Sequence, residues 1–262
     1  MERKTVDIGD TTLSILESGS GAPLVFVHGI VTTSELFRDV IECYAPRYRA
    51  IAVDLRGYGD SANPGHGYNI NQFAKDLARL FDVMELPRAV LLGVSMGGWI
   101  VTLLSYESPE RVNKVVNVAG GGTATRPLAS MVDFKMPTPE TIRDQIYHRF
   151  PEGSVDLEEM AAPYIKKTEL EGHGEAFGKV MKHMTDPITR PRYNTLRRMK
   201  YIKAPTLVIW GRDDKTNALE MGEATAASIP GSKLIVYDDT GHGVPNEQPE
   251  RFNKDIMDFF SS

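Results

Sequence analysis

Residues 89–106 read A-V-L-L-G-V-S-M-G-G-W-I-V-T-L-L-S-Y, and this stretch decides the fold. Its first four residues are apolar and have the length and composition of a buried strand. From Trp99 onward the apolar residues suit a buried helix. Ser95 stands at the bend between the two, with glycines at positions 93 and 97. A serine on such a turn takes a strained backbone conformation, so the residues two positions away must lack a side chain, and its hydroxyl is lifted clear of the sheet.

A serine hydroxyl is a weak nucleophile, so this hypothesis requires a base and a group that orients the base. The G-x-S-x-G pattern alone is weak evidence, since chance gives it odds of about one in ten in such a chain. In an open α/β sheet, side chains that act together lie at the carboxyl ends of strands. His242 follows the last predicted strand in a glycine-flanked loop, whereas His28 is better suited to shaping its own loop. Asp213 and Asp214 both follow the strand before it and are candidates for the acid.

Strand-like runs alternate with helical patterns on both sides of the serine stretch, which argues for a mostly parallel sheet with right-handed crossovers. Between residues 121 and 200 prolines recur and no strand-like run occurs, so short helices are predicted there. We therefore predict an α/β fold with a mostly parallel central sheet flanked by helices. Its core comprises residues 1–120 and 201–262, and a helical cap at 121–200 is inserted after the sixth strand. Predicted strands are 5–8, 11–16, 24–27, 50–53, 89–92, 114–119, 206–210 and 233–237; predicted helices include 34–44 with Ser34 as N-cap, 71–84, 138–150, 157–167, 175–184, 192–201, 218–228 and 249–260.

Composition limits the classes of partner. A formal net charge of −5 and the lack of a basic cluster with interleaved aromatic residues argue against nucleic acid and anionic membranes. No apolar run reaches the roughly 18 residues that span a bilayer, and the charged start Met1–Lys4 leads into strand-like residues without a signal segment. Cys43 is the single cysteine, so it excludes an intramolecular disulfide, and it is expected to be a small core residue. We expect a soluble, cytoplasmic protein acting on a small molecule; the oligomeric state is not indicated.

Five motifs spread over nearly the whole chain resemble the α/β-hydrolase superfamily. They are H-G-I at 28–30, D-L-R-G-Y-G-D-S at 54–61, G-V-S-M-G-G at 93–98, W-G-R-D-D at 210–214 and G-H-G-V-P-N-E-Q-P-E-R-F-N at 241–253. Together they are highly specific, and the segment 121–200 resembles the helical cap of that superfamily.

The resemblance implies a role for each site residue. The W-G-x-x-D pattern puts the acid on Asp214, with Asp213 capping the turn, and completes the triad Ser95, Asp214 and His242. His242 would take the proton of the Ser95 hydroxyl, which attacks a carbonyl carbon, and water would later release the acyl group. The amides of Ile30 and Met96 would form the oxyanion hole. His28 and Asp54 would hold loops, and no metal or organic cofactor is needed.

Three hypotheses about the activity stay open. The S-M-G-G elbow and the E-Q-P-E-R-F-N tail resemble carboxylesterases and enol-lactonases, which implies a small, largely apolar ester or lactone. The segment 202–214 is similar to hydrolases that cleave carbon–carbon bonds of vinylogous diketones, the meta-cleavage products. The third hypothesis is a small-molecule receptor, or a cofactor-free lyase or oxygenase, on the same scaffold. The cap residues expected to line an apolar pocket, unless they simply pack on the core, are Met131, Phe134, Tyr147, Phe177 and Met181.

Overall fold

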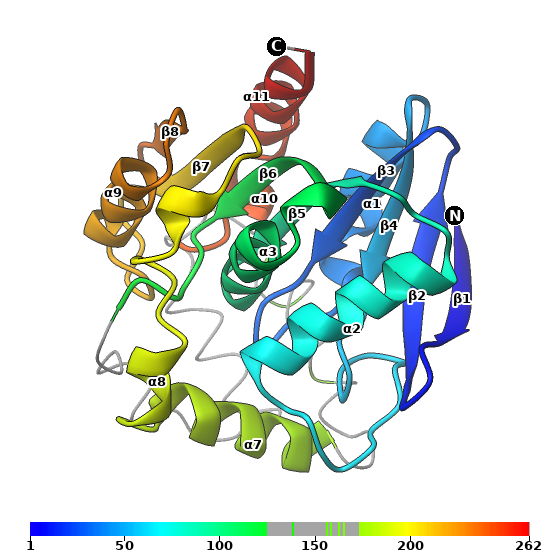
Figure 1. The fold of residues 1–262 in the computed structure, drawn as a ribbon. Coiled ribbons are helices and arrows are strands. Elements are labelled where there is room, and N and C mark those ends of the chain that lie inside the picture. The colour runs from blue at the N-terminus through cyan, green and yellow to red at the C-terminus, as the bar shows by residue number, and fades with distance from the viewer. Residues whose placement is uncertain are drawn as a thin grey trace.

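The computed structural model describes residues 1–124 and 173–261, together with Thr138, Asp156, Glu158, Ala162 and Ile165. Eight strands form one sheet in the order β1-β2-β4-β3-β5-β6-β7-β8, with helices on both sides (Figure 1). Only the β1–β2 and β2–β4 pairs are antiparallel, and the other five pairs are parallel. The strands are β1 (Glu2–Asp7), β2 (Thr12–Ser18), β3 (Ala22–Val27), β4 (Tyr48–Val53), β5 (Ala89–Val94), β6 (Val112–Val118), β7 (Thr206–Gly211) and β8 (Lys233–Tyr237).

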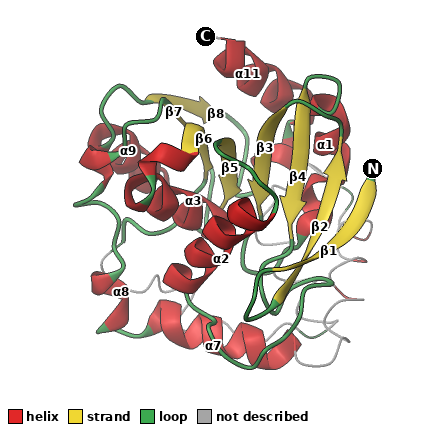
Figure 2. Cartoon of the chain, turned by 45° about the vertical axis from the view of Figure 1, so that its right-hand side comes forward, coloured by secondary structure: helices red, strands yellow, loops and turns green. Residues whose placement is uncertain are grey.

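Helices cover both faces of the sheet (Figures 1 and 2). On one face lie α2 (Ile70–Val83), α3 (Met96–Glu107) and α9 (Leu219–Ser228), and on the other lie α1 (Arg38–Tyr44) and α11 (Pro249–Ser261). Between β6 and β7 the described helices are α7 (His173–Thr185) and α8 (Thr189–Arg192). The short elements are α10 (Val244–Glu247) and the 3-10 turns η1 (Ser34–Phe37), η2 (Pro109–Arg111) and η3 (Met199–Tyr201).

The core is two apolar layers, because side chains alternate between the faces of a strand. In β3, Val25 and Val27 belong to the layer under α2 and α3, whereas Leu24 and Phe26 belong to the layer under α1 and α11. Strands buried on both faces need an almost continuous apolar sequence, and β5 is buried at all six positions. This pattern is why the central strands were predictable from composition.

Helices α7 and α8 lie apart from the helices that flank the sheet (Figures 1 and 2). Two contacts place α7 against the loop after β4, at the carboxyl end of the sheet. Lys179 Nζ donates to the carbonyl of Gly65 at 2.5 Å, and a side chain at Gly57 would collide with Ala176 at 2.6 Å. The buried residues of α7 join the same apolar layer as Met96 and Trp99.

The structure corrects three local predictions. The helix predicted at 34–44 begins as a 3-10 turn, and its N-cap is Thr33, whose hydroxyl accepts from the Glu35 amide. Cys43 is exposed on α1 and is not a core residue. No single helix spans 192–201, because the Thr195 amide donates to Gly122 O at 2.9 Å instead of to a helical carbonyl. The helices predicted at 138–150 and 157–167 lie outside the continuously described residues.

Candidate active site

Ser95 occupies the sharp turn between β5 and α3. Its backbone has φ 56° and ψ −115°, a region that a non-glycine residue rarely adopts and that costs on the order of 1–3 kcal/mol. A Cβ at Gly93 would collide with the carbonyl oxygen of Gly97, and a Cβ at Gly97 would collide with that of Val27. The prediction that both flanking positions must lack a side chain is therefore confirmed. Ser95 is also partly exposed within a run of buried residues.

Backbone hydrogen bonds fix the serine in this position. The Ser95 amide donates to Val118 O at 2.9 Å, which ties the turn to the carboxyl end of β6. The Ser95 carbonyl accepts from the Trp99 amide at 3.2 Å and from the Gly121 amide at 3.1 Å. Surrounding structure of this kind is what holds a strained residue in place.

His242 and Asp214 meet at the same edge of the sheet. Nδ1 of His242 lies 2.7 Å from Oδ2 of Asp214, and both residues are buried. The other carboxylate oxygen of Asp214 accepts from the amides of Thr216 and Asn217, each at 2.8 Å. Because the carboxylate can only accept, the proton of the imidazole sits on Nδ1 and leaves Nε2 as an acceptor.

Asp213 does not have the role expected of it. Its side chain is exposed, and the turn that it was expected to cap is capped by Oδ1 of Asp214. One carboxylate therefore both caps the turn and orients the imidazole.

A residue that the sequence analysis missed holds the His242 loop. The Glu247 carboxylate accepts from the amide of Gly241 at 2.7 Å and from that of Gly243 at 2.9 Å, on either side of His242. Burial raises the pKa of Glu247, while these two amides oppose the shift. Glu247 was visible in the quoted 241–253 motif, five positions after His242, but nothing in the pattern indicated its partners.

Neighbouring strands bring these groups to one edge. Ser95 follows β5, the Asp214 loop follows β7 and His242 follows β8, with β6 between β5 and β7. The Ala119 carbonyl after β6 accepts from the side chain of Asn217 at 2.7 Å, which joins the acid loop to the middle of the edge. Among the described residues no hydrogen bond joins the Ser95 hydroxyl to His242. Such bonds often form only when substrate is present.

The loop after β3 lies directly beside Ser95. A Cβ at Gly29 would lie 3.2 Å from the Ser95 Cβ, so Ile30 is at the edge of the same site. Met96 is the first residue of α3, and its amide has no acceptor within the helix. Neither the Ile30 nor the Met96 amide donates to any acceptor in the described part of the chain.

His28 and Asp54 hold loops, as predicted. The ring of His28 accepts from the Leu55 amide at Nε2 (3.1 Å), while its Nδ1 lies 2.7 Å from the Gly29 carbonyl. The fully buried carboxylate of Asp54 accepts from the amides of Ser34 at 2.7 Å and Asp60 at 3.1 Å.

Of the five predicted pocket residues, the structure describes two. Phe177 and Met181 are buried on α7, in the apolar layer that contains Met96. Met131, Phe134 and Tyr147 lie outside the described residues.

Comparison with known proteins identifies the family. The sequence profile of the alpha/beta hydrolase family matches residues 24–255. The chain belongs to this family. The fold class and the resemblance stated from the sequence are thus confirmed, and the protein is a hydrolase of the alpha/beta family.

Individual relatives of this alpha/beta hydrolase are distant. It is 30% identical over 264 residues to a 2-hydroxy-6-oxononadienedioate/2-hydroxy-6-oxononatrienedioate hydrolase of Burkholderia vietnamiensis, covering 93% of this chain and 88% of the relative. Its structure is similar to that of a meta-cleavage product hydrolase of Pseudomonas fluorescens IP01, with a TM-score of 0.88, 23% identity and coverage of 98% and 97%. It is also similar to the enol-lactonase of Burkholderia xenovorans LB400, with a TM-score of 0.84, 21% identity and coverage of 99% and 100%.

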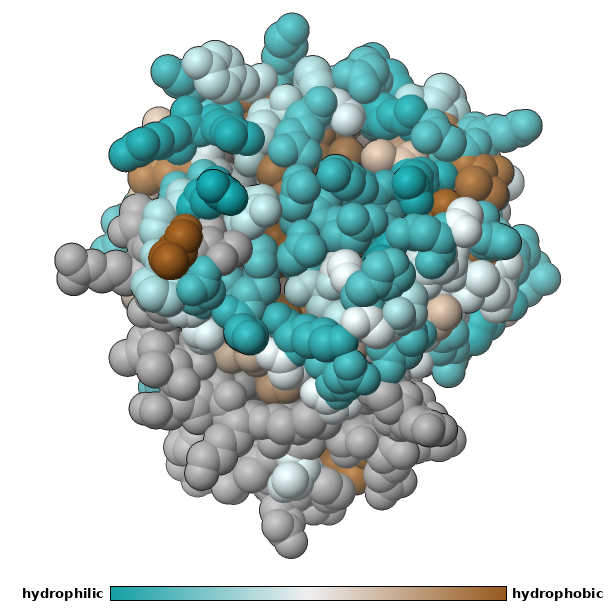
Figure 3. Space-filling view, turned by 60° about the horizontal axis from the view of Figure 1, so that its bottom comes forward, coloured by the Kyte–Doolittle hydropathy of each residue, from teal (hydrophilic) through white to brown (hydrophobic). Residues whose placement is uncertain are grey.

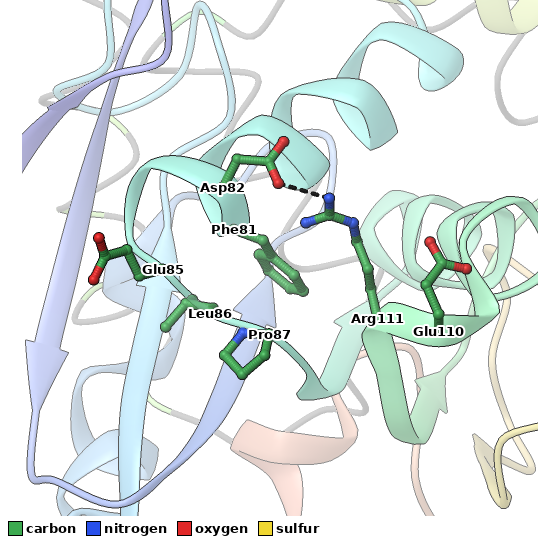
Figure 4. A pocket seen from close by; sticks show the side chains of 7 residues that line it. All are labelled: Phe81, Asp82, Glu85, Leu86, Pro87, Glu110 and Arg111. Atoms are coloured by element: carbon green, nitrogen blue, oxygen red, sulfur yellow. Dashed lines mark hydrogen bonds and ion pairs between the residues drawn. The ribbon is translucent and has the colours of Figure 1, made fainter.

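Two hollows formed by described residues lie at the opposite end of the hydrolase sheet. One is lined by residues at the end of α2, in the turn before β5 and in η2, and the Asp82–Arg111 ion pair of 2.6 Å closes one side of it (Figure 4). The other adjoins it near Arg88 and Lys203. Both are at the amino ends of β5 and β6, so neither contributes to the site at Ser95.

The described surface offers few apolar side chains. The surface in Figure 3 is largely hydrophilic with small, separate apolar spots. In the same part of the chain, no helix is long and apolar enough to cross a membrane, and no three His, Cys, Asp or Glu side chains cluster as metal ligands would. The large hydrophobic residues that are exposed there are Met1, Val83, Ile188 and Tyr201.

Proposed function

We propose that this alpha/beta hydrolase is a serine hydrolase that cleaves a small, largely apolar ester or lactone through an acyl-enzyme. The observation that carries the proposal is the 2.7 Å contact between His242 Nδ1 and the Asp214 carboxylate, at the sheet edge that also presents the strained Ser95. A base already oriented by a carboxylate is what a serine nucleophile requires.

In the proposed mechanism, Nε2 of His242 takes the proton of the Ser95 hydroxyl as the oxygen attacks the substrate carbonyl. Asp214 keeps the other ring proton on Nδ1 and stabilises the imidazolium that forms. His242 then gives its proton to the departing alcohol or to the lactone oxygen. The same ring next activates water, which attacks the acyl-enzyme and restores the Ser95 hydroxyl.

The amides of Ile30 and Met96 are the proposed oxyanion hole. Support comes from their position on either side of Ser95 and from the lack of an intrahelical acceptor at Met96. In comparable sites one such donor contributes roughly 3–4 kcal/mol to transition-state stabilisation.

The apolar character of the substrate is proposed from the segment between β6 and β7. Phe177 and Met181, on α7, contribute aromatic and thioether groups to the apolar layer that contains Met96. We propose residues 121–200 as the cap that selects the substrate and residues 1–120 and 201–262 as the catalytic core. A cytoplasmic location is part of the proposal, supported by the exposed thiol of Cys43, which a reducing compartment keeps free.

A second candidate is cleavage of a carbon–carbon bond in a vinylogous diketone. It is favoured by the 30% identity to the Burkholderia vietnamiensis hydrolase over most of both chains. The same serine, base and oxyanion groups would serve this reaction, with a carbanion rather than an alkoxide as the leaving group.

The test is turnover of a panel containing p-nitrophenyl butyrate, a γ-lactone and a vinylogous diketone, by wild type and Ser95→Ala. We expect Ser95→Ala to lower the preferred activity by about 10⁴-fold or more. The preferred substrate decides between the two candidates. Near-normal activity in Ser95→Ala contradicts the serine mechanism. No turnover by the wild type, with a ligand that still raises the melting temperature, would instead support a receptor.

A further inference from the structure

The loop that carries His242 has little regular structure of its own. It runs from the end of β8 at Tyr237 to α10, which has only four residues. His242 lies between Gly241 and Gly243, and glycine restricts the backbone less than any other residue. A helix of four residues is marginal on its own. Side-chain contacts are therefore needed to hold the imidazole in one place.

The side chain of Glu247 supplies contacts at both glycines. One carboxylate oxygen, Oε2, accepts from the Gly241 amide at 2.7 Å, and the other, Oε1, accepts from the Gly243 amide at 2.9 Å. The Glu247 amide in turn donates to the Gly243 carbonyl at 3.0 Å. Hydrogen bonds to a carboxylate are charge-assisted and roughly twice as strong as those between neutral groups. A neutral side chain at position 247 would hold the loop less firmly.

The peptide group that Oε2 binds also contacts the loop of the acid. This peptide joins Thr240 to the following glycine, and its carbonyl accepts from the Asp213 amide at 2.9 Å. The next residue, Asp214, makes the 2.7 Å contact with Nδ1 of His242. Because one peptide group connects Glu247 to the acid loop, the carboxylate fixes the backbone on which the contact between acid and base depends.

The Glu247 carboxylate also acts on the imidazole through its charge. Burial raises the pKa of Glu247; the two glycine amides and the charge of His242 oppose this shift, and Asp214 adds to it. His242 and Asp214 are the charged groups that act on this carboxylate. An attraction between two charges is mutual, so a negative Glu247 favours the charged form of the His242 ring. The proposed mechanism forms that charged ring when it takes the Ser95 proton.

We propose that Glu247 is a positioning residue for the base: its carboxylate holds the amides of Gly241 and Gly243, and its negative charge stabilises the imidazolium of His242 during proton transfer. Asp214 orients the ring through Nδ1, and Glu247 orients the backbone that carries the ring. The inference rests on the proposed function, because it takes His242 as the base. It adds a second carboxylate to the groups that support this base.

The experiment compares Glu247→Gln and Glu247→Asp with the wild type on the preferred substrate of the panel. Glutamine has nearly the same shape but no charge and one acceptor oxygen; aspartate keeps the charge but is one methylene shorter. We expect kcat to fall by about 10- to 100-fold in both variants, with KM nearly unchanged because the side chain acts through His242. The acid limb of the pH profile of kcat/KM should move to lower pH in Glu247→Gln only.

Glu250→Gln is the matched control. It is the same substitution three residues later, at an exposed position in the first turn of α11. It should leave kcat, KM and the pH profile unchanged. A loss of the same size in Glu250→Gln, or a wild-type kcat in Glu247→Gln, would overturn the inference. Should Glu247→Gln not fold, Glu247→Asp decides the positioning role, and a wild-type kcat in that variant overturns it.

A measurement without turnover tests the effect of the charge. In protein grown with isotope-labelled histidine, NMR follows the protonation of the His242 ring, whose signal is assigned by its loss in His242→Gln. We expect the ring to become protonated at lower pH in Glu247→Gln than in wild type or Glu250→Gln. Protonation at the same pH in all three would overturn the inference even if kcat falls, because the loss would then come from loop structure alone.

The same measurement separates this inference from the proposed function. If the protonation of His242 moves as expected while Ser95→Ala keeps its activity, the effect of Glu247 on His242 stands and the proposed function fails. If Ser95→Ala is inactive while Glu247→Gln behaves as the wild type in both measurements, the proposed function stands and this inference fails.

Discussion

Arg56 and Arg190 are both buried, but of the two only Arg56 has a carboxylate partner among the described residues. Arg56 follows β4 and is fully buried; its Nε and Nη2 donate to the two oxygens of Asp76 at 2.5 and 2.6 Å. Nη1 donates to the His66 carbonyl at 3.3 Å, and Asp10 is a third, more exposed partner at 3.2 Å. Arg190 has the Met184 carbonyl and the face of Trp99.

The difference shows in the pKa values of the two guanidinium groups. Burial alone would lower the pKa of Arg56, but the bonds to Asp76 outweigh it and the pKa is raised. For Arg190 burial acts alone and the pKa is lowered. Arg56 joins the loop after β4 to α2, and its charge is paired with the Asp76 carboxylate. Arg190 has no carboxylate partner among the described residues, and its Nε is buried without a hydrogen-bond partner.

Breaking the Arg56–Asp76 ion pair should lower stability more than removing the Arg190 guanidinium. Asp76→Asn leaves the Arg56 charge buried without its main partner, so we expect a loss of about 3–5 kcal/mol in the free energy of unfolding. Urea denaturation measures this. Asp10→Asn is the matched control: the same guanidinium loses a half-exposed carboxylate, and a loss of about 1 kcal/mol or less is expected. Equal losses in the two variants would show that burial does not set the strength of this pair.

Removing the Arg190 guanidinium should have little effect on stability. Arg190→Met replaces a buried, unpaired cation with an apolar side chain of similar length. The lost hydrogen bond to Met184 O is offset by relief of the buried charge, so we expect the free energy of unfolding to change by less than about 1 kcal/mol or to rise. A loss as large as that of Asp76→Asn in the same urea titration would mean that Arg190 is a structural residue.

The central part of the fold could be predicted because burial on both faces leaves a clear signal. Strands such as β5 are apolar throughout, and glycines 93 and 97 mark a turn where no side chain fits. The ends of helices were harder, since they depend on single hydrogen bonds. Thr33 rather than Ser34 caps the 3-10 turn before α1: the Thr33 hydroxyl accepts from the Glu35 amide, whereas the Ser34 hydroxyl is buried with no hydrogen-bond partner.

Of the candidate site, the sequence indicated residues but not the contacts that position them. The rule that acting side chains follow strands indicated His242 and left Asp213 and Asp214 as candidates for the acid. The resemblance chose Asp214, and its hydrogen bond to His242 was then observed. Glu247 was not found, because an acidic residue in a loop is usually solvated and its amide partners depend on how the loop folds. Nothing in the sequence indicated that Arg190 is buried. It sits among other basic residues in the sequence, and only the packing of Trp99 and Met184 around it shows that it is buried.

The central claim is that Ser95 is the nucleophile and that His242 activates it. The most direct measurement is labelling with p-nitrophenyl diethyl phosphate, followed by intact mass and peptide mapping. We predict one diethylphosphoryl group per wild-type chain, on the peptide that contains Ser95, none in Ser95→Ala, and labelling of His242→Ala slowed by about 10³-fold or more. Stoichiometric labelling of Ser95→Ala, or labelling of His242→Ala at the wild-type rate, would contradict the account.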